Sequence, residues 1–180
     1  DVLVIGAGPA GLAAALTAAR TGARVILADE NFVPGGRCLA ERRTIDGQPA
    51  ADWAAQTIAE LRSMPDVRLF PRTTVFGVFD DGVYGAVERL NDHLPAPPEF
   101  QPRQRVWRVI AKQAVLASGS IERPLVFGNN DLPGIMLAGA VRTYLNRYAV
   151  LPGRRAVVFT DNDDGWTTAA DLVAAGGQVA

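Results

Sequence analysis

The sequence predicts an α/β fold in which helices cover both faces of a parallel sheet and an antiparallel β-meander is inserted into it. Residues 2–5 form a continuous apolar run that leads through a glycine-rich turn into an Ala-rich stretch. Such a run is typical of a parallel strand that is buried on both faces, followed by a helix packed on the sheet. Three later segments alternate in polarity or are rich in β-branched residues, which indicates antiparallel strands.

The first part of the chain predicts a strand, a turn, a helix and a second strand. After the strand at residues 2–5, a helix over residues 12–21 ends at Gly22, a residue that readily adopts left-handed backbone. Residues 24–28 form a second apolar strand. Because crossover connections between parallel strands are right-handed, we expect the two strands to lie side by side.

The middle of the chain predicts a helix over residues 52–64, a short strand over residues 67–70 and then the meander. Asp80-Asp81-Gly82 has the composition of a hairpin turn between the first two strands of the meander. A buried strand over residues 113–117 and a helix over residues 137–150 follow. The three expected meander strands are residues 73–79, 83–90 and 105–111.

Composition and charge argue against several classes of protein. The chain has 180 residues, of which 48% are hydrophobic and 21% charged, the balance of a globular domain. A net charge of −1 argues against a nucleic-acid surface. The uncharged run at residues 2–19 is interrupted by glycine and proline, which argues against a membrane span. Cys38 is the single cysteine, so we expect no disulfide, no metal site and a cytoplasmic location.

A glycine motif lies at the turn from the first strand into the first helix. Gly6 allows a tight turn, Gly8 lets the backbone approach a pyrophosphate, and Gly11 permits close contact between helix and strand. Pro9 and Ala10 complete the motif, and the N–H groups at the start of the helix attract phosphate. With a strand before it and a helix after it, the motif predicts a Rossmann-like site for an adenine dinucleotide.

An acidic residue stands where such a site needs one. Asp29 follows the second strand at 29 − 6 = 23 positions after the first glycine, the spacing expected for the residue that binds the adenosine ribose. Its carboxylate would accept hydrogen bonds from the ribose hydroxyls and disfavour a 2′-phosphate. Glu30 either assists at the ribose or is a solvated acid at the end of the strand.

Three motifs together resemble the two-dinucleotide flavoprotein family, whose best-known members are the disulfide reductases. They are the glycine motif, Gly35-Gly36-Arg37 and Leu116-Ala117-Ser118-Gly119. The resemblance implies that Gly36, Arg37, Ser118 and Gly119 line the dinucleotide and that Thr74 and Val75 meet its adenine. The redox cysteine pair of the disulfide reductases is absent, because Arg43 stands five positions after Cys38 where their second cysteine lies.

A closer resemblance is to the α subunit of heterotetrameric sarcosine oxidase. It rests on the run from Arg72 to Gly77 and on a long run from Glu122 to Tyr148, which includes Pro133-Gly134-Ile135-Met136-Leu137. The resemblance implies oxidative demethylation of sarcosine to glycine, with other subunits of the oxidase as partners. It implies NAD at the glycine motif, whereas FAD in the β subunit and a covalent FMN at the α–β contact lie outside this chain.

The second strand–turn–helix unit lacks the features of a nucleotide site. Residues 160–165 read Thr-Asp-Asn-Asp-Asp-Gly, so side chains and three carboxylates replace the glycines that a phosphate needs. We therefore expect a dinucleotide-binding domain at residues 1–151 and the start of a second, degenerate Rossmann-like unit at residues 152–180. No catalytic group is identified, because His93 is the sole histidine and lies in a proline-rich loop.

Three functions are compatible with these patterns. The first is a dinucleotide-binding module of a multisubunit amine oxidoreductase, inactive alone, with NAD or alternatively FAD in the glycine motif. The second is a self-contained FAD-dependent, NAD(P)-linked reductase, and the third is a non-catalytic scaffold subunit with a structural nucleotide. The strand-like residues at both ends also suggest a piece of a longer polypeptide.

Overall fold

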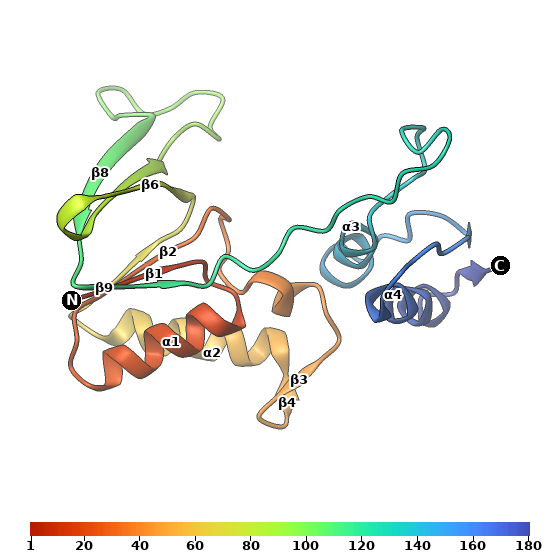
Figure 1. The fold of residues 1–180 in the computed structure, drawn as a ribbon, viewed down its shortest axis with the longest axis horizontal. Helices are drawn as coiled ribbons and strands as arrows, with labels where there is room; N and C mark the ends of the chain where they lie inside the picture. Colours follow the sequence, from red (N-terminus) through yellow and green to blue (C-terminus); the bar gives the residue numbers. More distant parts are fainter. The chain divides into compact units, whose positions relative to one another are not determined.

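The computed structural model describes residues 1–180, which form two compact units (Figure 1). Unit 1 comprises Asp1–Gly36 and Ala51–Gly119, and unit 2 comprises Arg37–Ala50 and Ser120–Ala180. These units do not divide the chain between residues 151 and 152, and the domain boundary expected there stays a prediction.

The centre of unit 1 is a four-stranded parallel sheet in the order β5-β2-β1-β9. The strands are apolar and lie at the expected places along the sequence. Because all four run in one direction, their carboxyl ends, where α/β proteins bind ligands, share one edge of the sheet. The bounds are β1 (Val2–Ile5), β2 (Val25–Ala28), β5 (Val67–Phe70) and β9 (Gln113–Leu116).

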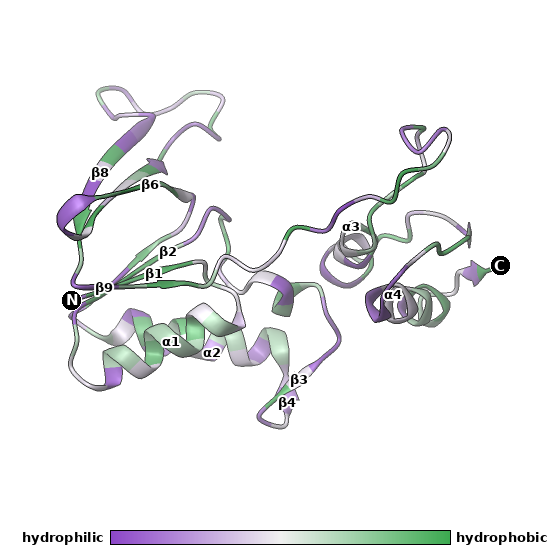
Figure 2. Ribbon diagram, in the orientation of Figure 1, coloured by the Kyte–Doolittle hydropathy of each residue, from purple (hydrophilic) through white to green (hydrophobic).

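The helices α1 (Pro9–Arg20) and α2 (Ala50–Ser63) cover one face of this sheet (Figure 1). Successive right-handed crossovers from β1 to β2 and from β2 to β5 place both helices on the same side. α1 begins three residues before the expected start, since Pro9 has the backbone angle of a first helical residue and needs no hydrogen-bond partner there. Figure 2 shows the hydrophobic colours concentrated in β1, β9 and much of α1.

The meander covers the other face, so the second helical layer expected in unit 1 is replaced by strands. Its order is β6-β7-β8, and the left-handed backbone of Asp81 and Gly82 confirms the turn between its first two strands. Val109 and Ala111 pack with Leu3 of the parallel sheet in one apolar cluster. The bounds are β6 (Thr73–Phe79), β7 (Val83–Arg89) and β8 (Gln104–Ile110).

Apart from α4 (Asp163–Ala174), unit 2 contains short elements only. The helix expected over residues 137–150 is α3 (Ala138–Arg142) followed by one wide turn (Thr143–Arg147), in which the Thr143 hydroxyl donates to the Gly139 carbonyl. The strand that precedes the turn at residues 160–165 is the two-residue β10, which pairs with β11, and Val157 beyond it is 79% exposed. The remaining bounds are η1 (Gly36–Leu39), β3 (Thr44–Ile45), β4 (Gln48–Pro49), β10 (Arg155–Ala156), α4 (Asp163–Ala174) and β11 (Gln178–Val179).

A buried arginine holds unit 2 together. The Arg142 side chain is 2% exposed, and its Nε lies 3.2 Å from Asp171 Oδ2 while its Nη1 lies 3.4 Å from Glu41 Oε1. Asn146 donates to the same Asp171 oxygen and to the Ala40 carbonyl, both at 2.9 Å. The interior of unit 2 thus contains this polar network beside the buried apolar side chains of Leu145 and Leu172.

No helix in the structure combines the length and the apolar character that crossing a membrane requires.

The first prediction tests the packing of α1 on the sheet. Leu12 is fully buried, so Leu12→Ala leaves a cavity and is expected to lower the free energy of unfolding by about 2–5 kcal/mol. Thr17→Ala, at an exposed position of the same helix, is the matched control and should change it by less than about 0.5 kcal/mol. Denaturant unfolding of both variants measures the difference, and equal effects would contradict this packing.

Candidate dinucleotide-binding site

The glycine motif forms a tight loop at the carboxyl end of β1. Gly6 has a φ of +100°, and a Cβ built there would lie 2.4 Å from the Ala117 carbonyl oxygen. The Gly6 N–H donates to the Ala28 carbonyl at 2.8 Å, which continues the pairing of β1 with β2 by one residue. Only glycine satisfies both the left-handed backbone and the close approach of the strand after the meander.

Gly11 brings the first turn of α1 against this loop. A Cβ at Gly11 would lie 1.8 Å from the Gly6 carbonyl oxygen, a distance that no side chain tolerates. The helix start therefore sits directly on the loop, and the third glycine of the motif has the role that the sequence predicts for it.

Gly8 leaves open space in front of α1. Its backbone is extended (φ −73°, ψ −176°), and a Cβ built on it would meet no atom within 4 Å. No side chain caps α1 and no acidic residue lies in its first turn. The first-turn N–H groups have no acceptor within the helix, and the positive end of the helix dipole points at this space. The open space at Gly8 and the N–H groups of α1 therefore suit an anionic diphosphate, which binds through backbone donors.

Asp29 is fixed beside the loop. Its side chain is buried, and its Oδ2 accepts the Ala7 N–H at 2.6 Å. Its Oδ1 accepts the backbone N–H of Asn31 at 2.8 Å and the side-chain amide of Asn31 at 3.0 Å. Three of about four acceptor positions are used, so the carboxylate keeps room for a further donor such as a ribose hydroxyl. Glu30 is exposed, as expected for a solvated acid.

The Gly35-Gly36 turn packs on the same loop. The Gly35 N–H donates to the Ala7 carbonyl at 2.8 Å. Gly36 has a φ of +52°, and a Cβ there would lie 2.8 Å from the Cα of Gly8. The structure thus brings Gly36 to the glycine motif, whereas Arg37 belongs to unit 2, where its side chain pairs with Asp164.

The start of the meander and the end of β9 also reach this edge of the sheet. The Thr73 N–H donates to the Asp29 carbonyl at 2.8 Å, which places the following Thr74 and Val75 near the acid. The Thr74 hydroxyl accepts a hydrogen bond from the Arg89 guanidinium at 3.1 Å. Ser118 lies at the other side of the loop, with its Cα 3.0 Å from a Cβ built at Gly6, and Gly119 follows it with a φ of +73°.

Sequence reasoning missed two residues of the site. Asn31 donates two hydrogen bonds to Asp29, and Ala117 lines the floor of the loop at Gly6 and Gly11. Asn31 follows the acid by two residues, the spacing of a local side-chain-to-backbone turn, so its role was readable from the sequence. Nothing local indicates the role of Ala117, which is more than 100 residues away in the chain.

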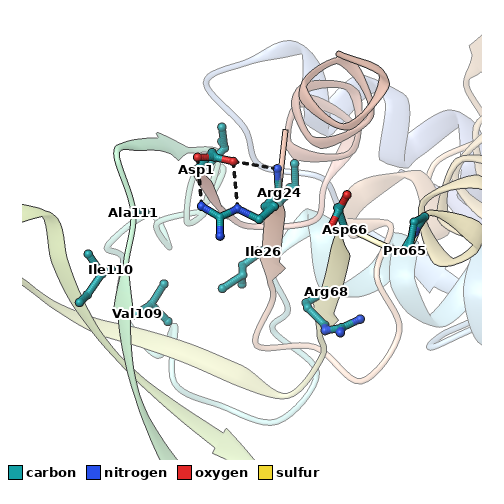
Figure 3. A pocket seen from close by; sticks show the side chains of 11 residues that line it. Asp1, Arg24, Ile26, Pro65, Asp66, Arg68, Val109, Ile110 and Ala111 are labelled. Atoms are coloured by element: carbon teal, nitrogen blue, oxygen red, sulfur yellow. Dashed lines mark hydrogen bonds and ion pairs between the residues drawn. The ribbon is translucent and has the colours of Figure 1, made fainter. Parts of the chain in front are cut away.

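A separate pocket lies at the opposite edge of the sheet (Figure 3). It has a volume of about 300 Å³ and is lined at the amino ends of β1, β2 and β5, where Asp1 forms an ion pair with Arg24. Ligands of open α/β sheets bind at the carboxyl ends of the strands. This pocket is therefore distinct from the dinucleotide site.

Cys38 and His93 are the one thiol and the one imidazole of the chain. Burial, with a contribution from the nearby Glu41 carboxylate, raises the pKa of the Cys38 thiol, so the sulfur stays protonated and weakly nucleophilic. His93 is exposed in its loop, as expected. What the candidate site offers to a ligand is backbone N–H donors, the open space at Gly8 and the carboxylate of Asp29.

The degenerate second loop is closed by side chains. Asn162, rather than one of the three acids, caps α4 by accepting the Asp164 N–H at 3.0 Å. A Cβ at Gly165 would lie 2.4 Å from the side chain of Thr160, which fills the space beside the helix. That no nucleotide binds to this loop stays a prediction.

The fold and the loop together define a Rossmann-like dinucleotide-binding protein of the flavoprotein type. Residues 1–93 match the family model described as FAD dependent oxidoreductase. The chain therefore belongs to the FAD-dependent oxidoreductase family, and the expected oxidoreductase class and Rossmann-like dinucleotide-binding fold are confirmed. The family match supports FAD-type dinucleotide binding, whereas NAD stays a prediction.

Known relatives confirm the resemblance seen in the sequence. The chain is 59% identical to sarcosine oxidase subunit alpha of Rhizobium meliloti over 98% of its own length and 18% of the relative. It is 52% identical to sarcosine oxidase subunit alpha of Corynebacterium sp. over 100% of its own length and 19% of the relative. The chain thus spans about a fifth of the length of these relatives.

A solved structure shares the fold. The structure of L-proline dehydrogenase from P. horikoshii matches 99% of this chain and 34% of that chain, with a TM-score of 0.80 and 24% sequence identity. At this identity the likeness supports the fold, in agreement with the α/β class predicted from the sequence.

The second prediction compares the contributions of Gly8 and Gly11 to thermal stability. Gly11→Ala places a methyl group on the Gly6 carbonyl and is expected to lower the melting temperature by at least about 5 °C or to prevent folding. Gly8→Ala points into open space and should leave the melting temperature of the nucleotide-free protein within about 2 °C of the original. Thermal unfolding of the two variants checks this, and an equally large loss for Gly8→Ala would contradict the loop geometry.

Proposed function

We propose that this chain is the dinucleotide-binding module of an amine oxidoreductase subunit of the sarcosine oxidase α type. The observation that carries the proposal is 59% identity to a sarcosine oxidase α subunit over 98% of the chain, which includes the glycine loop. The reaction is the oxidative demethylation of sarcosine to glycine. Because residues 6–11 have no side chain that can act as an acid, a base or a nucleophile, and Asp29 is assigned to the ribose, the chemistry is assigned to flavins outside this chain, and the module alone is inactive.

Different residues of the candidate site are proposed to bind different parts of the dinucleotide. The backbone at Gly8 and the N–H groups of α1, with Pro9 and Ala10 in its first turn, hold the pyrophosphate. Asp29 accepts the ribose hydroxyls of the adenosine half. The remaining contacts come from the family resemblance: adenine at Thr74 and Val75, and the lining residues Gly36, Arg37, Ser118 and Gly119.

NAD is the proposed occupant. The loop recognises the ADP half that NAD and FAD share, so its geometry suits both. The choice of NAD rests on the resemblance to sarcosine oxidase α. In that family FAD and FMN are expected in other parts of the complex. FAD in this loop is the second candidate, and the match to the FAD-dependent family model favours it.

The proposal extends to partners and location. The relatives are named as α subunits, which supports assembly with other subunits of a heterotetrameric oxidase. We place the complex in the cytoplasm, where a single unpaired thiol is ordinary.

The third prediction identifies the occupant. Heat denaturation of the full-length protein is expected to release, from this subunit, a nucleotide that absorbs near 260 nm and has the mass of NAD. Separation of the subunits before heating assigns each released nucleotide to its chain. FAD from this subunit would replace the NAD assignment by the second candidate, and release of no nucleotide together with no binding of added NAD would contradict the proposal.

The fourth prediction tests the role of Gly8 in binding. Gly8→Ala fills the space proposed for the pyrophosphate, so the dissociation constant for NAD should rise at least tenfold, about 1.4 kcal/mol. Thr17→Ala, on the exposed face of α1, serves as the control and should bind as the original protein does. Isothermal titration of the nucleotide-depleted protein measures both, and unchanged affinity in Gly8→Ala would place the phosphates elsewhere.

A further inference from the structure

The segment Arg37–Ala50 is a strap: it packs in unit 2, whereas the residues before and after it belong to unit 1. Its middle is fastened to the wide turn after α3. The Ala40 carbonyl accepts the side-chain amide of Asn146 at 2.9 Å, and Arg42 Nε donates to the amide oxygen of Asn146, also at 2.9 Å. Glu41 adds an ion pair to the buried Arg142.

The first residue of the strap is held by two carboxylates. Arg37 Nη2 donates to Asp164 Oδ2 at 2.7 Å, and its Nε pairs with Glu41. Two of its five N–H groups are thereby used, so three remain for another acceptor, and the side chain is 55% exposed. The hydrogen bond to Asp164 raises the pKa of Arg37, and the same bond lowers the pKa of Asp164.

Asp164 lies in the loop that would hold the phosphate of a second dinucleotide. It is in the first turn of α4, and besides Arg37 it has the guanidinium groups of Arg43 and Arg142 at 3.7 Å. The neighbouring Asp163, in the same helical turn, has no arginine partner. The Asp164 carboxylate at the start of α4 is thus paired with two arginines of the strap, Arg37 and Arg43, and with Arg142 of α3.

Covalent continuity joins this ion pair to the first glycine loop. Arg37 directly follows Gly36, and successive Cα atoms are about 3.8 Å apart whatever the arrangement of the two units. Gly36 in turn packs on Gly8, as its built Cβ lies 2.8 Å from the Cα of Gly8. Gly36 and Arg37 are also consecutive residues of the short helix η1 (Gly36–Leu39), so an ion pair that fixes Arg37 acts on the element that begins at the Gly35-Gly36 turn.

We propose that Asp164 is a positioning residue for the first dinucleotide site: it fixes Arg37, and through Arg37 it fixes the Gly35-Gly36 turn against Gly8. This inference rests on the proposed dinucleotide binding at the glycine loop. The degenerate second loop has then exchanged nucleotide binding for an internal ion pair that supports the first site.

The fifth prediction tests this role in the full-length protein. Asp164→Asn should raise the dissociation constant for NAD about three- to fivefold, the scale of a partly exposed ion pair, and speed hydrogen exchange of the amides at residues 37–42. Asp163→Asn removes the same charge from the same helical turn without touching an arginine, and should change neither quantity. Arg37→Ala should weaken binding to a similar extent, and adding Asp164→Asn to it should have no further effect on the affinity.

The outcomes separate this inference from the proposed function. Unchanged affinity in Asp164→Asn, an effect equal to that of Asp163→Asn, tighter binding, or additivity with Arg37→Ala would each overturn the positioning role. If Gly8→Ala still weakens binding in that case, the proposed dinucleotide function stands. A full-length protein that binds no dinucleotide would overturn both, whatever the strap amides show.

Discussion

The contact between Gly11 and the Gly6 carbonyl is the constraint on which the rest of unit 1 depends. A built Cβ on Gly11 would approach that oxygen to 1.8 Å, so the helix can sit on the loop only when residue 11 is glycine. This contact sets where α1 begins, and with it the direction of the first-turn N–H groups and the open space at Gly8. The binding property of the loop is thus a consequence of helix–strand packing rather than of any reactive side chain.

Asp29 links that loop to the rest of the sheet edge. Its side chain binds the N–H of Ala7, its carbonyl accepts the N–H of Thr73, and its own N–H donates to the Phe70 carbonyl. One residue therefore ties β2, β5, the start of the meander and the glycine loop together. A carboxylate held by so many hydrogen bonds is already oriented before a ligand arrives, which lowers the entropy that binding would otherwise cost.

Local patterns predicted the features that depend on local physics. The apolar runs gave β1, β2, β5 and β9, and the glycine spacing gave the loop and the acid. Contacts between residues far apart in the sequence could not be predicted. The wide turn after α3 and the buried position of Arg142 depend on partners such as Glu41, which is 101 residues away from Arg142. The pairing of Arg37 with Asp164, 127 residues apart, has no local signal either. The strands of the meander could be predicted from the sequence, but the face of the sheet that they cover could not. A helical layer was therefore expected where the meander lies.

We propose that one dinucleotide binds to this chain, with its pyrophosphate at the start of α1. The most direct measurement is the electron density of the full-length protein crystallised with NAD. Density is expected for the pyrophosphate beside Gly8, with the ribose on Asp29, and none at the start of α4. Density for the nucleotide at α4, or a glycine loop left empty while NAD binds elsewhere on the subunit, would contradict it.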